Sequence, residues 1–270
     1  MNLTFIGGGN MATAIIGGLL QRGWRADQLR AVEIIAAARD KLEQTYQIKT
    51  FSGLSAEAMH TDCVVLAIKP QQMREAAVQL APLIGGALVI TIAAGIRGAD
   101  LSRWLGNHPR IVRVMPNTPA LVLAGISGLY ATPGVSAEDR KRASEIMGAV
   151  GETVWVEREE DIDSVTAVSG SGPAYVFYFI EALEEAAREL GMSAQAARQL
   201  ALATFTGASK LAAQSTEDAA TLRQRVTSKG GTTERALAAM EGDQIKAAIV
   251  RAVKAAAERS RELGDELGRG

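Results

Sequence analysis

Four short apolar runs in the first half of the chain are each followed by glycine, proline or other small residues. The runs cover residues 3–6, 63–68, 88–92 and 111–115. Apolar runs of this length are typical of strands that are buried on both faces of a parallel sheet. Ligands bind outside the carboxyl ends of such strands. The pattern therefore predicts a ligand site at one edge of the sheet.

The first of these runs leads into three glycines and then into an alanine-rich helix. Gly7 suits a tight turn, Gly9 lets the backbone approach a pyrophosphate, and Ala12 lets the helix pack closely on the strand. The N–H groups near Asn10 and Met11 would hold the phosphates with the help of the helix dipole. A glycine triplet can also be a flexible turn, but the flanking strand and helix favour dinucleotide binding.

A second strand is predicted over residues 29–33, between the first two of these runs, and it ends in Glu33. In such folds an acidic residue about 20 residues beyond the glycines accepts a hydrogen bond from a ribose 2′-hydroxyl. The charge of Glu33 would repel the 2′-phosphate of NADP, and Ile34 and Ile35 supply no cation to accept one. This favours NAD(H), although Arg39 on the next helix could reach back and reverse the preference. The alternative is that Glu33 is an exposed charge at the end of a strand.

Other predicted contacts with the dinucleotide lie after the apolar runs at residues 63–68 and 88–92. Backbone at the end of residues 63–68 should face the cofactor, and the proline that follows fixes a turn there. The small residues after the third run leave room for a ring. The predicted cofactor-binding residues are Ile6, Gly7, Gly8, Gly9, Asn10, Met11, Glu33, Ala67, Ile68, Lys69, Pro70 and Ala94.

Composition excludes several classes of protein. With 29 basic and 30 acidic residues the formal net charge is −1, so no polyanion-binding face and no nucleic-acid partner are expected. The single cysteine, Cys63, lies in an apolar run, where we expect it to be buried; a disulfide framework is impossible, which fits the cytoplasm. No apolar run reaches the length of a membrane span. His60 and His108 lie among polar residues, where we expect surface side chains and no metal site.

The pattern changes near residue 160, after strand-like runs near residues 126–130 and 153–156. Beyond it we find only helical runs. We therefore predict an α/β fold, with a Rossmann-type dinucleotide-binding domain over residues 1–160 and an all-helical domain over residues 161–270. Two strongly apolar helices, near residues 172–190 and 194–213, offer more hydrophobic surface than one copy can cover, which predicts a homodimer.

A second informative stretch covers residues 226–237, where hydroxyl side chains and a Gly-Gly pair precede a helix start. Backbone N–H groups, with hydroxyls such as those of Ser228, Thr232 and Thr233, can form an anion site that suits a carboxylate. The alternative is a capping box with threonine as the N-cap and Glu234 nearby. A cap explains one hydroxyl but not four, so the pattern favours the anion site.

These motifs together resemble the pyrroline-5-carboxylate reductase family over the whole chain, and the most specific ones lie in the second half. The resemblance implies reduction of 1-pyrroline-5-carboxylate to L-proline, the last step of proline biosynthesis, with NADPH or NADH as hydride donor. It also implies a helical dimerisation domain and often a decamer of five dimers. The motifs that carry it cover residues 5–12, 66–70, 114–119, 169–175 and 226–237.

The resemblance implies roles for individual residues. It makes Thr233 the catalytic residue, through a hydrogen bond to the ring nitrogen of the substrate. The implied substrate-binding residues are Ser228, Gly231, Thr232 and Thr233. The chain departs from the family at Lys229, where many relatives have proline, and at the end of the second strand, where relatives that favour NADPH often carry Ser, Thr or Arg.

Two other functions compete with this one. A β-hydroxyacid dehydrogenase also has a Rossmann domain followed by helices. In that family a helix after the domain boundary carries a catalytic lysine, and residues 172–191 contain no lysine, which counts against this function. A non-catalytic dinucleotide-binding regulator would keep the glycine loop and would not need the hydroxyl-rich loop.

Overall fold

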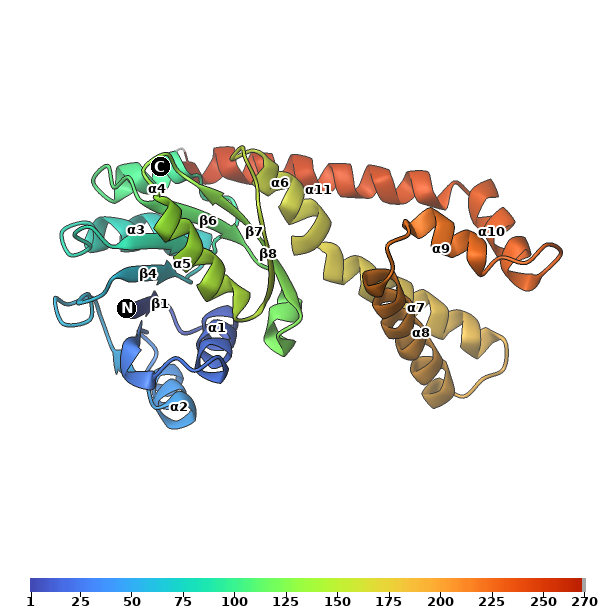
Figure 1. Ribbon diagram of the computed structural model, residues 1–270, viewed down its shortest axis with the longest axis horizontal. Coiled ribbons are helices and arrows are strands. Elements are labelled where there is room, and N and C mark those ends of the chain that lie inside the picture. The colour runs from blue at the N-terminus through green and yellow to red at the C-terminus, as the bar shows by residue number, and fades with distance from the viewer. Residues whose placement is uncertain (269–270) are drawn as a thin grey trace. The chain divides into compact units, whose positions relative to one another are not determined.

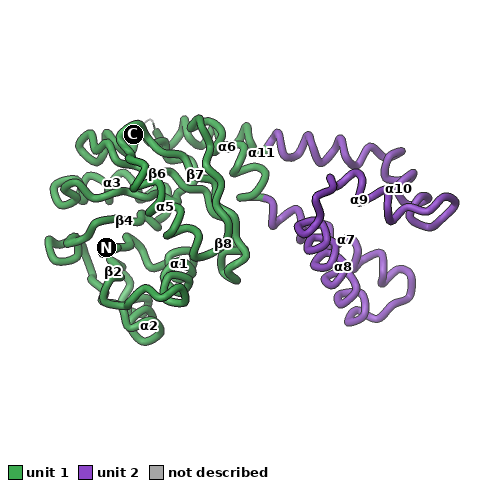
Figure 2. The backbone as a smooth tube through the Cα atoms, viewed as in Figure 1, with its two compact units in different colours: residues 1–171, 256–270 green, residues 172–255 purple. Residues whose placement is uncertain are grey.

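The chain forms two compact units in a computed structural model that describes residues 1–268 (Figure 2). The first unit contains Met1–Ser171 and the chain from Ala256 onward, and the second contains Gly172–Ala255. The sequence placed the boundary near residue 160. The division falls later because the segment before Ser171, although helical, packs on the sheet and buries Ile162 and Ala167.

The first unit is built on an eight-stranded sheet with the order β3-β2-β1-β4-β5-β6-β7-β8 (Figure 1). Strands β1 to β6 are parallel, β7 is antiparallel to β6, and β8 is parallel to β7. This confirms the predicted α/β class. The strands are β1 (Leu3–Ile6), β2 (Leu29–Val32), β3 (Lys49–Phe51), β4 (Cys63–Leu66), β5 (Leu88–Thr91), β6 (Ile111–Met115), β7 (Gly125–Ala131) and β8 (Gly151–Trp155).

Strand β3 was not predicted from the sequence. It is three residues long, lies at the edge of the sheet beside β2, and contains a lysine and a threonine. An edge strand this short carries no apolar run, so its pattern is indistinguishable from that of a polar connection.

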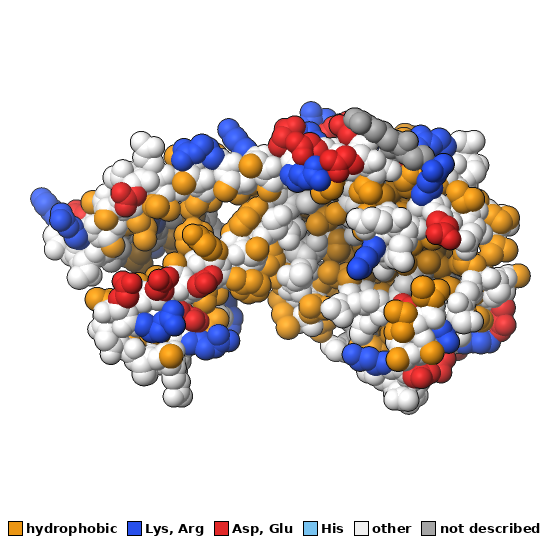
Figure 3. All heavy atoms as spheres, turned by 180° about the vertical axis from the view of Figure 1, so that it is seen from behind, with side chains coloured by type: hydrophobic (Ala, Val, Ile, Leu, Met, Phe, Trp, Pro, Cys, Tyr) orange, Lys and Arg blue, Asp and Glu red, His pale blue; other side chains and the backbone are white. Residues whose placement is uncertain are grey.

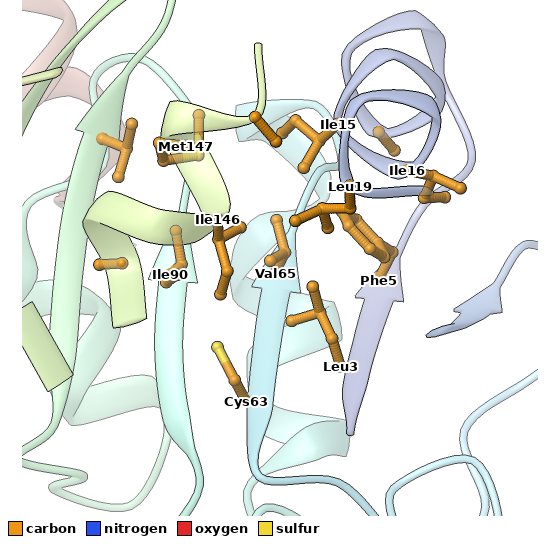
Figure 4. Packing of buried hydrophobic residues seen from close by; sticks show 14 of the residues in the cluster. Leu3, Phe5, Ile15, Ile16, Leu19, Cys63, Val65, Ile90, Ile146 and Met147 are labelled. Carbon is orange, nitrogen blue, oxygen red and sulfur yellow. The ribbon is translucent and has the colours of Figure 1, made fainter. Parts of the chain in front are cut away.

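Helices cover both faces of the sheet. Strand residues alternate between the faces, so that Leu3 and Phe5 of β1 join one apolar cluster and Ile6 joins the other. Figure 4 shows Ile15 and Leu19 of the first helix packed over β1 and β4. The first face carries α1 (Asn10–Gln21), α2 (Ala36–Tyr46) and α5 (Ala137–Gly148), and the second carries α3 (Pro70–Leu80) and α4 (Gly98–Trp104).

The described part of the second unit is helical. Large apolar side chains remain exposed on it, among them Phe177 at 64% and Leu211 at 58%, and Figure 3 shows hydrophobic side chains along its surface. The short helix α6 (Asp161–Val165) still belongs to the first unit. The helices of the second unit are α7 (Gly172–Glu189), α8 (Ala194–Gln214), α9 (Ala219–Arg225), α10 (Thr232–Gly242) and the first part of α11 (Ile245–Gly268). The rest of α11 belongs to the first unit.

Side-chain contacts explain why the end of α11 belongs to the first unit. The Ser260 hydroxyl donates a hydrogen bond of 2.6 Å to Asp163 Oδ1, and Arg97 pairs with Asp265 at 2.6 Å. Leu267 packs beside the apolar cluster under α3 and α4. The sequence predicted a long helix from residue 243 to residue 267 but not that its last turns pack on the first unit.

The prediction that His108 is a surface residue is wrong. Its side chain is buried, and its Nε2 lies 2.9 Å from the carbonyl oxygen of Ala87. Burial lowers the pKa of His108 below its usual value. The polar neighbours in the sequence gave no sign of this contact, which depends on how the segments before β5 and β6 meet. Burial of Cys63, by contrast, is confirmed, and it raises the pKa of the thiol.

A partly buried ion pair anchors α5. Arg110 contacts both carboxylate oxygens of Asp139, at 3.1 and 2.7 Å, and Asp139 also forms a capping box with Ser136. Burial by itself raises the pKa of Asp139, but the hydrogen bonds from Arg110 and Ser136 outweigh it and hold that pKa below its usual value. A group whose pKa is lowered by folding stabilises the fold above its unfolded pKa, and this contribution is lost as the pH falls through the folded pKa.

We therefore expect Asp139→Asn to lower the free energy of unfolding of the first unit by about 1–3 kcal/mol at pH 7 and to flatten its acid dependence. Urea unfolding at pH 7 and pH 3, followed by tryptophan fluorescence, measures this because Trp24, Trp104 and Trp155 all lie in this unit. Glu138→Gln, on the exposed face of the same helix, is the control. An equal loss at both pH values would contradict the account.

Candidate functional site

The glycine loop joins β1 to α1 at the carboxyl ends of the parallel strands. Gly7 has a φ of +99°, and a Cβ atom there would lie 2.6 Å from the carbonyl oxygen of Ala67 on the neighbouring strand segment. Gly9 precedes α1 as its N-cap, and no heavy atom lies within 4 Å of the position of its Cβ. The loop therefore needs glycine at residue 7 for its own packing and leaves open backbone at residue 9. This arrangement fits a pyrophosphate at the start of α1.

A cavity of about 380 Å³ opens beside this loop, on the side of β2 and β4. Its lining combines apolar side chains with a few charged ones, which suits a dinucleotide. Seven of the predicted cofactor-binding residues line it: Ile6, Gly7, Gly9, Glu33, Ala67, Ile68 and Lys69.

The other five predicted cofactor residues do not line this cavity. Asn10 and Met11 form the first turn of α1, and Pro70 is the first residue of α3. Ala94 lies in the turn after β5. Gly8 does not line it either, but its N–H donates to Glu33, which does.

The sequence did not identify several residues that line the cavity. Two come from the loop after β3, the strand that was not predicted, and four share one face of α3 at helical spacing. The helical spacing of these four residues could have indicated that one face of α3 lines the cavity. The residues are Val32, Ile34, Ile35, Gly53, Leu54, Gln72, Glu75, Ala76 and Gln79.

Glu33, which lines this cavity, is held by backbone N–H groups of two different loops. Its Oε2 accepts a hydrogen bond from Gly8 N–H and its Oε1 accepts one from Ile35 N–H, each at 2.8 Å. Ile35 is the N-cap of α2, so the carboxylate also lies at the positive end of that helix. Arg39 donates from Nη1 to the carbonyl oxygens of Glu33 and Ile34, at 2.8 and 3.0 Å. Glu33 is therefore a fixed anion and not a freely moving surface charge.

The hydroxyl-rich loop of the second unit ends at the start of α10. Gly231 is the N-cap, and no side chain caps the helix. A Cβ at Gly231 would lie 2.5 Å from Ser228 Oγ, so glycine is needed for that hydroxyl to approach the helix start. Glu234 accepts a hydrogen bond of 2.7 Å from Gly230 N–H. The alternative of a threonine N-cap is therefore wrong.

This helix start has the properties of an anion site. The first N–H groups of a helix have no partner within the helix, and here no capping side chain takes those of Thr232 and Thr233. Ser228 and Thr232 are exposed and Thr233 is half-buried. The Thr227 hydroxyl, by contrast, donates to the carbonyl oxygen of Arg223 at 2.7 Å and is engaged elsewhere.

Within residues 1–268, no group of three or more His, Cys, Asp or Glu side chains is arranged to hold a metal ion. No helix of this part of the chain is both long enough and apolar enough to cross a membrane.

Family models match both parts of the chain. Residues 159–263 match the family described as pyrroline-5-carboxylate reductase dimerisation. Residues 2–95 match the family described as NADP oxidoreductase, coenzyme F420-dependent.

Individual relatives match over almost the whole chain. A pyrroline-5-carboxylate reductase of Pseudomonas aeruginosa is 43% identical, with 98% of both chains covered. A solved structure of the Coxiella burnetii reductase superposes with a TM-score of 0.93 at 39% identity, over 97% of this chain and 98% of that one. The Plasmodium falciparum enzyme with NADP bound gives a TM-score of 0.86 at 29% identity, over 98% of both chains.

The similarity thus extends over both units, and it includes the glycine loop and the uncapped start of α10 whose geometry is described above. It also shows that the chain uses a nicotinamide dinucleotide and that its helical part is a dimerisation domain. The chain belongs to the pyrroline-5-carboxylate reductase family.

Proposed function

We propose that the chain reduces 1-pyrroline-5-carboxylate to L-proline at a site in which the start of α10 holds the substrate carboxylate. The observation that carries this proposal is the N-cap Gly231, which leaves the first N–H groups of α10 without a capping side chain. A carboxylate there would gain hydrogen bonds from these N–H groups and the favourable field of the helix dipole. The hydroxyls of Ser228 and Thr232 would complete its binding.

The cavity beside the glycine loop would bind the cofactor. Gly7, Gly9 and the start of α1 would hold the pyrophosphate of a nicotinamide dinucleotide, which supplies the hydride when bound. Glu33 would accept a hydrogen bond from the adenosine ribose. Ala67, Ile68 and Lys69 would line the binding site along the end of β4.

Reduction adds one hydride to the carbon of the C=N bond, and the electron pair of its π bond moves to nitrogen. The nitrogen already carries its proton when the substrate is an iminium ion, so the protein need not supply a strong general acid. We assign Thr233 a hydrogen bond to this ring nitrogen. Orientation of donor and acceptor would then be the main contribution of the protein, an effect that reaches roughly 7–11 kcal/mol in favourable geometry.

We further propose that the chain forms a homodimer through its helical unit. Its exposed apolar side chains, such as Phe177 and Leu211, and its match to a dimerisation family support a homodimer. A decamer of five such dimers and a location in the cytoplasm stay predictions. Sedimentation of the purified protein tests the oligomer, and a stable monomer would contradict it.

A substrate without its carboxylate tests the anion site. We expect 1-pyrroline to show a kcat/KM about 10- to 100-fold below that of pyrroline-5-carboxylate, because charged hydrogen bonds at the start of α10 would be lost. Thr232→Val should bring the kcat/KM values of the two substrates closer together, since it removes a hydroxyl that would bind the carboxylate and keeps the side-chain volume almost constant. Thr227→Val is the matched control, because its hydroxyl is engaged with Arg223. Equal kcat/KM values for both substrates would contradict the proposal.

A further inference from the structure

We propose that the adenosine end of the cavity selects a dinucleotide with a free 2′-hydroxyl, so that NADH is preferred to NADPH, and that Glu33 makes this selection. The inference rests on the dinucleotide site proposed above. It differs from what is seen in the Plasmodium falciparum relative, which holds NADP.

The position of the Glu33 carboxylate is fixed. Backbone N–H groups of Gly8 and Ile35 each donate a hydrogen bond of 2.8 Å to a different carboxylate oxygen. Gly8 makes this approach possible, because a Cβ there would lie 3.3 Å from Glu33 Oε2. A 2′-phosphate would meet an anion that cannot turn away without breaking both hydrogen bonds.

The same contacts remove donors that a phosphate would need. The N–H of Ile35 lies at the start of α2, where a helix N-terminus otherwise favours anions, and it already binds Glu33. Each carboxylate oxygen keeps a second lone pair that can accept a hydrogen bond from a ribose hydroxyl. The arrangement accepts a hydroxyl donor and repels a phosphate acceptor.

In the described part of the chain, no cationic side chain lines the cavity next to Glu33. Among the lining residues of the described chain, the one cationic side chain is that of Lys69, which follows β4, whereas Glu33 follows β2 on the other side of β1. Arg39 does not line the cavity, and its Nη1 bridges the carbonyl oxygens of Glu33 and Ile34. A turn towards a phosphate would leave both carbonyls without this donor.

Apolar side chains occupy the rest of this end. Ile34 is 73% exposed and Ile35 is 61% exposed, and both line the cavity together with Leu54. Such a surface suits the face of an adenine ring and offers a phosphate no hydrogen bond. Charge repulsion and the missing donors therefore act in the same direction, which is how a site discriminates against a close analogue.

Direct binding tests the inference. Tryptophan fluorescence titration of the full chain should give a dissociation constant for NAD⁺ roughly 30-fold or more below that for NADP⁺. ADP-ribose and its 2′-phosphorylated form, which lack the nicotinamide, should show the same preference. NADP⁺ binding as tight as NAD⁺ binding in the unmodified protein would overturn the inference.

Two variants identify the residue responsible. Glu33→Gln should lower the ratio of the two dissociation constants by about 10-fold, because the charge is removed while the size is kept. Asp40→Asn, an equal change of charge on α2 outside the cavity, should leave the ratio unchanged. If Glu33→Gln weakens both ligands equally, Glu33 only holds the glycine loop and the assignment fails. If Arg39→Ala selectively weakens NADP⁺, Arg39 is a phosphate ligand and the assignment also fails.

Turnover separates this inference from the proposed function. Reduction of pyrroline-5-carboxylate by NADPH with no preference for NADH would overturn the inference and leave the reductase intact. Tight binding of NAD⁺ without turnover from either reduced cofactor would overturn the proposed function and leave the selection by Glu33 standing.

Discussion

Thr233→Ala is expected to lower kcat/KM for pyrroline-5-carboxylate about 10- to 100-fold, the loss typical of one hydrogen bond to a charged group. Thr233 is half-buried in the first turn of α10, and its hydroxyl has no capping role there, since no side chain caps this helix. Its removal should therefore spare the fold. Steady-state kinetics with saturating reduced cofactor measures the effect.

Two comparisons make this result specific. Thr233→Ser keeps the hydroxyl and should restore most of the activity, whereas a role in packing alone would not be rescued. The dissociation constant of the dinucleotide should stay the same in both variants, because Thr233 lies outside the cavity beside the glycine loop. Full activity of Thr233→Ala would remove it from the reaction.

Gly7→Ala should abolish measurable dinucleotide binding and also destabilise the first unit. The added Cβ would lie 2.6 Å from the carbonyl oxygen of Ala67, which is backbone and has little room to move, and a φ of +99° strains any residue with a Cβ. The expected loss of stability is about 1–3 kcal/mol. Fluorescence titration with NAD⁺ and urea unfolding measure the two effects.

Gly9→Ala separates binding from folding. Its Cβ would meet no heavy atom within 4 Å, and its φ of −70° is allowed for every residue. We therefore expect normal stability with dinucleotide affinity at least about 10-fold weaker, because the methyl group would occupy the space of a phosphate. Unchanged affinity in Gly9→Ala would place the pyrophosphate elsewhere.

The sequence was sufficient for features that depend on local pattern. The buried strands β1, β4, β5 and β6 and the long helices α7 and α8 lie within a few residues of their predicted ranges. Their apolar runs and helical stripes reflect burial that each element needs by itself. Strand β3 and the burial of His108 depend on neighbours distant in the sequence, and no local pattern could show them.

The same distinction applies to the candidate site. The glycine loop and Glu33 were identified because their spacing is fixed by the fold. The contact of Glu33 with Gly8 was not foreseen, since it joins the ends of two neighbouring strands through a side chain. Likewise, the pattern around Thr232 showed a helix start but not that its N-cap is Gly231.

The most direct test of the account is oxidation of NADH, and separately of NADPH, by the purified full chain in the presence of pyrroline-5-carboxylate. We expect turnover that depends on this substrate, yields L-proline and falls sharply in Thr233→Ala. Absence of turnover with both cofactors, in protein that binds a dinucleotide, would contradict the central claim that this chain is a pyrroline-5-carboxylate reductase.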